Sequence, residues 1–201
     1  HSNQISAVQI VPQNLANWVH LNVGNIGQYS RGYNSYLETN GKLENHEALI
    51  KKLPAASTDK ILGLIDNEMG VFSAGRSNAQ AFHFAYFNFR NEELCKQSLE
   101  SLADSNFIEG YRGYIIRKVE ALNLLPRLFG RLFDRMHQPF YILYGDFVIF
   151  GEDQTALKVL LNDLLDDKRL YKSASFQSLS NQLPGKSHIQ IVTGFPEWLP
   201  N

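Results

Sequence analysis

The sequence has a single cysteine, Cys95, and lacks both a long hydrophobic run and an excess of either charge. One cysteine cannot form an internal disulfide or build a cysteine-based zinc cluster. No apolar run approaches the ~20 residues that span a bilayer, so we predict no transmembrane segment in this stretch. Nineteen basic and twenty acidic residues give a net charge of -1. No overall field therefore favours nucleic acid, and we expect no nucleic-acid partner.

The composition is that of a folded, apolar chain. Of the 201 residues, 44% are hydrophobic, 12% are aromatic and 19% are charged, which is typical of a globular protein and not of a disordered one. We assign residues 6–194 to a single α+β domain with a helical insertion at about 42–66. Residues 195–201 are interpreted as the start of a linker to a missing C-terminal region.

The stretch 139–167 predicts a β-hairpin followed by a helix. Phe140–Tyr144 and Phe147–Phe150 are apolar runs separated by a Gly-Asp dipeptide, which is typical of a two-residue hairpin loop. Asp153 is suited to cap the helix that follows. Pairing through such a loop leaves neither face of the hairpin polar. We therefore expect both faces to be covered, by a second helical layer, another part of the protein or a partner.

Two earlier regions repeat this order of strand, strand and helix. The chain thus offers three such units, which start near residues 6, 68 and 139. We predict one largely antiparallel sheet with helices packed on a face, an α+β sandwich of two layers. The expected strands besides the hairpin are Ser6–Val11, Ala16–Val23, Met69–Ser73, Ala81–Phe89, Tyr111–Val119 and His188–Thr193. The expected helices besides the one after Asp153 are Ile26–Leu37, Asn45–Leu53, Thr58–Asp66, Asn91–Asp104, Leu122–Met136 and Ser175–Gln182.

The sequence contains no catalytic or metal-binding signature. The six histidines do not stand at metal-ligand spacing from one another. His20, His83 and His188 fall in predicted strands, where two of them and a carboxylate such as Glu68 would have to converge to hold a metal; we interpret them as ordinary histidines. Cys95 lies on the apolar side of its helix and is predicted to be a core residue. We predict no metal and no cofactor.

Two features are more distinctive. Arg127, Arg131 and Arg135 recur every four residues and form an arginine stripe on the predicted helix Leu122–Met136, a candidate surface for an anion or an acidic partner. The chain also has more aromatic residues than a core needs, which favours an interface or an apolar pocket. The candidate interface aromatics are Trp18, Tyr33, Tyr36 and Trp198.

The order of several hydrophobic segments suggests a family. IVPQNLANWVHLNV, then ILGLIDNEMGVFS, GYIIRK, LLPRLFGRLF and PFYILYGDFVIFGEDQTALKVLLNDLLDDKRL follow one another along nearly the whole chain. This order resembles an uncharacterised family of large envelope proteins of Bacteroidetes, whose members look like secreted or lipid-anchored proteins with a repetitive β-rich region. The resemblance implies a periplasmic or cell-envelope location and carries over no catalytic residue.

Two functional hypotheses follow. The first is a non-catalytic binding or scaffold module of a larger envelope protein, whose ligand is a protein partner or a neighbouring domain; it predicts an apolar or aromatic surface patch beside the sheet. The second is a small-ligand, lipid-binding or hydrolytic domain whose site is assembled from separate strands. That site would combine His83, Glu68 and the arginine stripe in one pocket.

Overall fold

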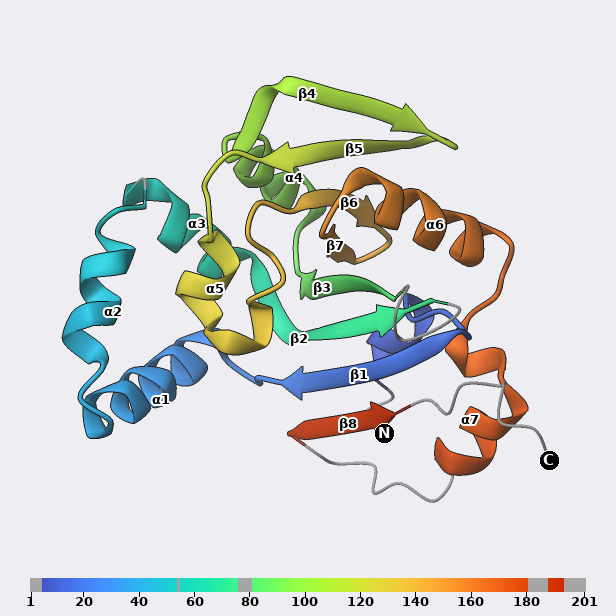
Figure 1. Ribbon diagram of the computed structural model, residues 1–201, viewed down its shortest axis with the longest axis horizontal. Helices are drawn as coiled ribbons and strands as arrows, with labels where there is room; N and C mark the ends of the chain where they lie inside the picture. Colours follow the sequence, from blue (N-terminus) through green and yellow to red (C-terminus); the bar gives the residue numbers. More distant parts are fainter. Residues whose placement is uncertain (1–4, 54, 76–80, 181–187, 194–201) are drawn as a thin grey trace.

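An eight-stranded sheet in the order β4-β5-β6-β7-β3-β2-β1-β8 organises the molecule (Figure 1). The structure is a computed structural model that describes residues 5–53, 55–75, 81–180 and 188–193. Every pairing in the sheet is antiparallel, which confirms the predicted α+β fold class. The strands are β1 (Leu15–Asn22), β2 (Ile65–Ala74), β3 (Phe82–Phe89), β4 (Ala103–Tyr111), β5 (Tyr114–Val119), β6 (Phe140–Tyr144), β7 (Phe147–Gly151) and β8 (Ile189–Thr193).

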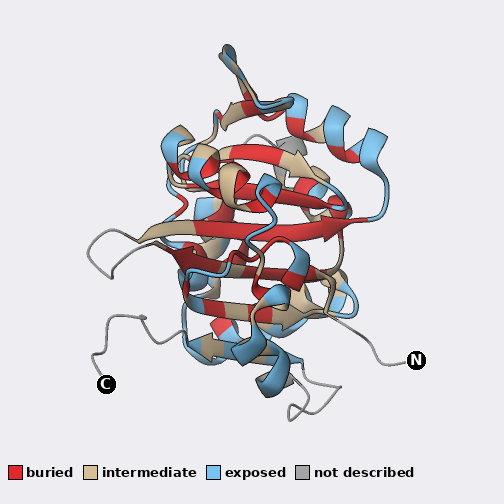
Figure 2. Cartoon of the chain, turned by 90° about the vertical axis from the view of Figure 1, so that its right-hand side faces the viewer, coloured by how far each residue is buried: buried red, intermediate tan, exposed pale blue. Residues whose placement is uncertain are grey.

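Helices cover both faces of this sheet. One face packs against α1 (Ile26–Thr39), α2 (Leu43–Ile50), α3 (Ala55–Leu64), α4 (Glu92–Glu100) and α5 (Leu124–Phe129), and we call it the α1–α5 face. The opposite face, the α6 face, packs against α6 (Gln154–Leu165), α7 (Ala174–Ser180) and the 3-10 helices η1 (Ser6–Gln9) and η4 (Leu170–Lys172). The fold therefore has three layers instead of the two that the sequence predicted, and Figure 2 shows the central strands buried between them.

The hairpin of β6 and β7 explains why two covers are needed. Its pairing follows the predicted register, with Ile142 opposite Ile149 and Leu143 opposite Val148. Val148 belongs to the hydrophobic core of the α1–α5 face and Ile149 to that of the α6 face, and both side chains are 0% exposed. The expectation that both faces of the hairpin are covered is confirmed, and the cover comes from this domain.

The first predicted strand, Ser6–Val11, is wrong. Residues Ser6–Gln9 form the 3-10 helix η1, because the Glu68 carboxylate accepts hydrogen bonds from the backbone amides of Ser6 and Ala7. A short apolar run buries its side chains equally well as a helical turn, so periodicity alone cannot separate the two. The first unit has only one strand, and the three-unit pattern is not confirmed.

Strand β4 was missed by the sequence prediction. The helix expected to run to Asp104 is α4, which ends at Glu100, and β4 begins at Ala103. β4 is the outer strand of the sheet, and its polar sequence ADSNFIEGY has alternating half-buried and exposed side chains instead of an apolar run. Its turn to β5 uses positive φ angles at Arg112 and Gly113.

The predicted helix Leu122–Met136 is broken into two pieces. α5 ends at Phe129, and the 3-10 helix η3 covers Arg131–Phe133. Gly130 lies between them with a φ of 82°, a conformation that ends a helix and favours glycine. The predicted helical insertion at about 42–66 does contain helices, namely α2 and α3.

Candidate functional site

A row of polar side chains crosses neighbouring strands at one end of the sheet. Asn17 on β1 is opposite both Thr193 on β8 and Ser73 on β2, and Ser73 is opposite His83 on β3. Glu152, the residue after β7, hydrogen-bonds to His83. Directly opposed residues of antiparallel strands lie on the same face of a sheet, so these side chains share one face. We call Thr193, Asn17, Ser73, His83 and Glu152 the polar row.

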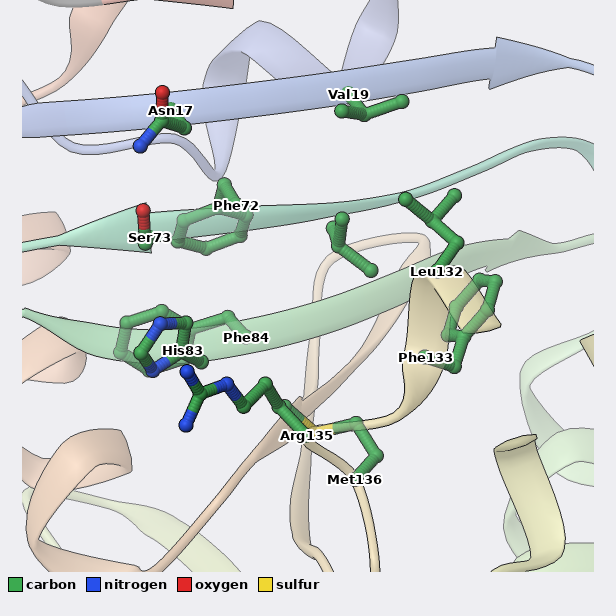
Figure 3. A pocket seen from close by; sticks show the side chains of 11 residues that line it. Asn17, Val19, Phe72, Ser73, His83, Phe84, Leu132, Phe133, Arg135 and Met136 are labelled. Atoms are coloured by element: carbon green, nitrogen blue, oxygen red, sulfur yellow. The ribbon is translucent and has the colours of Figure 1, made fainter. Parts of the chain in front are cut away.

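A pocket of about 230 Å³ lies over the middle of the polar row. Its floor includes Asn17, Ser73 and His83 beside the apolar Val19 and Val71. The opposite wall is the segment that follows α5, where Leu132, Phe133, Arg135 and Met136 line the pocket. In Figure 3 the Arg135 side chain extends from this wall toward His83, while Asn17, Ser73 and His83 follow one another across β1, β2 and β3.

The sequence of the wall explains its shape. Gly130 ends α5, and the chain then places Phe133 and Met136 in the core, where they are 2% and 1% exposed. A continuous helix would carry Arg135 on the same side as Arg131. After the break, Leu132 and Arg135 instead lie at the rim of the pocket, with their apolar neighbours buried beneath them. The break at Gly130 is therefore what brings a cationic group to the polar row.

His83 and Glu152 are joined by two hydrogen bonds. Glu152 Oε2 lies 3.3 Å from His83 Nδ1, and Glu152 Oε1 accepts the backbone N–H of His83 across 3.3 Å. A carboxylate only accepts hydrogen bonds, so Nδ1 must carry the proton in this contact. In the neutral imidazole, Nε2 then has a free lone pair. Both side chains are about one-third exposed, at 32% and 30%, and water reaches them.

The arginine stripe predicted from the sequence does not form. Arg135 lines the pocket, but neither Arg127 on α5 nor Arg131 on η3 does. Within the described part of the chain, Arg135 has no ion pair with a carboxylate. One arginine of the three thus faces the polar row with its charge available to a ligand.

Glu68, expected beside His83, belongs to a different and buried cluster on the α6 face. Its carboxylate accepts the Ser6 hydroxyl at 2.7 Å as well as the two η1 amides. Burial lowers the pKa of His20 in the same cluster, and the Glu68 charge opposes that shift. Among the residues that the structure describes, no group of three potential metal ligands comes together. The predicted combination of His83, Glu68 and the three arginines is therefore wrong in two respects. Glu68 lies on the other face of the sheet, and only one of the three arginines lines the pocket.

The candidate interface aromatics have different environments. Trp18 is 1% exposed and is a core residue, so it is not available to a partner. Tyr33 is half-buried and stacks between Tyr29 and Tyr36 along α1, and Tyr36 is 57% exposed. Trp198 lies outside the described residues. Only the α1 tyrosines therefore remain as a candidate aromatic surface.

The buried thiol of Cys95 and the exposed side chains of β8 are two further features of the structure. Cys95 is buried, as predicted, and burial next to Glu92 raises the pKa of its thiol to about 12, which keeps it protonated. An apolar patch beside the sheet stays a prediction; two isoleucines of the outer strand β8, Ile189 and Ile191, are 60% and 72% exposed. They are opposite Leu21 and Val19 and so share the α1–α5 face with the pocket.

No family model, curated protein or solved structure matches this chain. Within the described ranges, the helices are too short or too polar to cross a membrane.

Sequence reasoning found His83 and Arg135 but missed Asn17, Ser73 and Glu152. Each of the missed residues is a single polar side chain close to the end of a strand or just after it, a position where polar residues are ordinary. The signal that unites them is the strand register, which depends on the order of strands that are far apart in the sequence. That order is not visible in the local pattern.

Proposed function

We propose that this domain is a binding module and that its site is the pocket over the polar row. The ligand we infer is a small molecule with one anionic group and a short apolar part. The observation that supports this proposal is the position of Arg135, which lines a partly apolar pocket and has no described carboxylate as its partner.

The chemistry of the lining fits such a ligand. The Arg135 guanidinium presents planar donors that suit a carboxylate or a phosphate. The Asn17 amide and the Ser73 hydroxyl line the same pocket and are further donors. Glu152, the nearby anion, is engaged by His83 through two hydrogen bonds. The positive charge at the rim is therefore available for an incoming anion.

The apolar lining limits the rest of the ligand. Val19, Val71, Leu132 and Met136 offer contacts to a short hydrocarbon part. The volume of about 230 Å³ is below the range of roughly 300–1,000 Å³ that holds drug-sized ligands, so we expect a small molecule. Short-chain carboxylates such as butyrate meet both requirements.

Isothermal titration calorimetry tests the proposal with acetate, butyrate, hexanoate and inorganic phosphate as probes. We expect butyrate to bind and R135Q to weaken its binding by about 10- to 100-fold, the loss of a hydrogen bond to a charged group. R131Q is the matched control, because Arg131 is an exposed arginine of the same segment that does not line the pocket. Equal affinities for wild type and R135Q, or no binding of any probe to the wild type, would refute the proposal.

We also propose that the domain acts outside the cytoplasm, as part of a larger envelope protein. The segment order described for the sequence supports this location. Fractionation of the source cells with an antibody against this domain tests it: the protein should be found in the periplasmic or membrane fraction. Recovery with cytosolic marker proteins would contradict the location and would leave the binding site unaffected.

A further inference from the structure

The polar row places three side chains in the order that acyl transfer requires: a hydroxyl, an imidazole and a carboxylate. Ser73 is on β2, His83 is on the neighbouring strand β3, and Glu152 directly follows β7, the next strand along. Ser73 and His83 both line the pocket. We propose that this row hydrolyses short-chain carboxylic esters, with Ser73 as nucleophile, His83 as general base and Glu152 as the residue that positions His83.

The geometry of the imidazole supports these roles. Glu152 binds Nδ1 of His83, so Nε2 is the nitrogen left to accept a proton from a hydroxyl group. Ser73 lies directly opposite His83, and directly opposed residues have Cβ atoms about 4.5–5.5 Å apart. Serine and histidine are neighbours but are not hydrogen-bonded to each other in this structure. Rotation about the Cα–Cβ bond of Ser73 brings the hydroxyl toward the ring, and such contacts often tighten only when substrate binds.

The reaction balances with water as the only co-reactant. The Ser73 oxygen forms a bond to the ester carbonyl carbon while its proton moves to His83 Nε2. The carbon–oxygen bond to the alcohol then breaks, and the alcohol leaves with the proton from His83. Water attacks the acyl-serine in the same way, and its proton passes through His83 to the Ser73 oxygen. The product is a carboxylic acid, which ionises to the carboxylate that Arg135 is proposed to bind.

The remaining polar groups of the pocket supply charge stabilisation. The carbonyl oxygen becomes negative when serine attacks, and donors that face this oxygen lower the barrier. Arg135 and Asn17 line the pocket on either side of Ser73 and His83 and are the available donors (Figure 3). This inference rests on the proposed function, because the substrate is an ester of the carboxylate class that the pocket is proposed to hold.

The first experiment uses an alkyl fluorophosphonate probe and mass spectrometry of the labelled peptides, together with hydrolysis of p-nitrophenyl butyrate. We expect the label on Ser73, no label in S73A, and unchanged labelling in S105A, a variant of an exposed serine on β4. H83Q should slow ester hydrolysis by about 10²- to 10⁴-fold, the usual contribution of general-base catalysis. Circular dichroism establishes that each variant is folded.

The positioning role of Glu152 has its own readout. E152Q should slow hydrolysis, and E152D should restore part of the rate, because a carboxylate is retained to accept the proton of Nδ1. If Glu152 contributed only to the stability of the fold, E152Q and E152D would not differ from each other in the rate of hydrolysis.

Butyrate binding to the wild type, measured beside its reaction with the probe, separates the two proposals. If the wild type binds butyrate but the probe labels no serine, or labels a serine other than Ser73, the hydrolytic inference is overturned and the binding proposal stands. If the wild type neither binds butyrate nor reacts with the probe, both proposals fail. Labelling of Ser73 with rates unaffected by H83Q would overturn the assignment of His83 as the base.

Discussion

The Tyr86 hydroxyl lies 2.9 Å from Nδ1 of His20, inside the core of the α6 face. Trp18 Nε1 donates a hydrogen bond to the same hydroxyl at 2.9 Å. Since an indole N–H only donates, the hydroxyl accepts from Trp18 and can donate its own proton to His20. His20 is then the acceptor at Nδ1. A chain of two hydrogen bonds thus satisfies three large buried side chains and joins β1 to β3, the two strands on either side of β2.

Removal of the Tyr86 hydroxyl should destabilise the fold. In Y86F the Trp18 N–H and His20 Nδ1 both lose their partner while they stay buried, at a cost of about 1–3 kcal/mol for each unsatisfied group. Urea unfolding measures this loss in the free energy of unfolding. Y36F is the matched control, because Tyr36 is 57% exposed and its change should be within about 0.5 kcal/mol. Equal stability of Y86F and wild type would show that the hydrogen bonds contribute nothing.

Stability should fall in acid through His20. Burial lowers the pKa of His20 below its ordinary value of 6.5, so the unfolded chain binds the proton more readily than the folded chain. The contribution of this neutral imidazole to stability is therefore present above pH 6.5 and is lost as the pH falls below it. Urea unfolding at pH 7.5 and pH 5.5 should show a smaller loss for H20Q than for wild type. A loss of the same size in both proteins would exclude His20 as the source.

Gly130 should resist substitution by alanine more than Gly32 does. Its φ of 82° is strained for any other residue, and a Cβ would lie 2.5 Å from the Tyr33 hydroxyl. We expect G130A to lower the free energy of unfolding by about 1–3 kcal/mol. G32A in α1 is the contrasting variant: a Cβ there meets nothing within 4 Å, and alanine should stabilise the helix by about 0.5–1 kcal/mol. Both changes are measured by thermal and urea unfolding.

Truncation of a core side chain should destabilise the protein on either face of the β6–β7 hairpin. Ile149 faces the α6 core and Phe150 faces the α1–α5 core, with exposures of 0% and 1%. We expect I149A to cost about 2–5 kcal/mol and F150A about 3–5 kcal/mol. Ile115 on β5 is 54% exposed, and I115A should change stability little. If only one of the two core variants were destabilised, the hairpin would not be covered on both sides.

Local pattern predicted those parts of the fold whose cause is local. The β6–β7 hairpin follows from a two-residue loop between two apolar runs, and α6 begins where Asp153 accepts the N–H of Ala156, as the sequence indicated. Asn91 caps α4 in the same way, through the N–H of Leu94. In these cases the stabilising contact joins residues close in the chain, so the sequence contains the evidence.

Predictions failed where a distant partner decides the structure. Residues 6–9 form η1 because Glu68, far along the chain, binds their amides. β4 is a strand because β5 pairs with it, although its own residues are polar. The three arginines do not align, because the chain turns at Gly130 to place Phe133 and Met136 in the core.

The sequence by itself determined the fold class, the hairpin with two apolar faces and the core position of Cys95. Tertiary structure alone decided the candidate site. Asn17, Ser73, His83 and Glu152 meet only because β1, β2, β3 and β7 are neighbours in register, and Arg135 reaches them only because α5 ends early. The physical reason is that strand pairing and core burial are satisfied over the whole chain, whereas each of these polar residues is locally unremarkable.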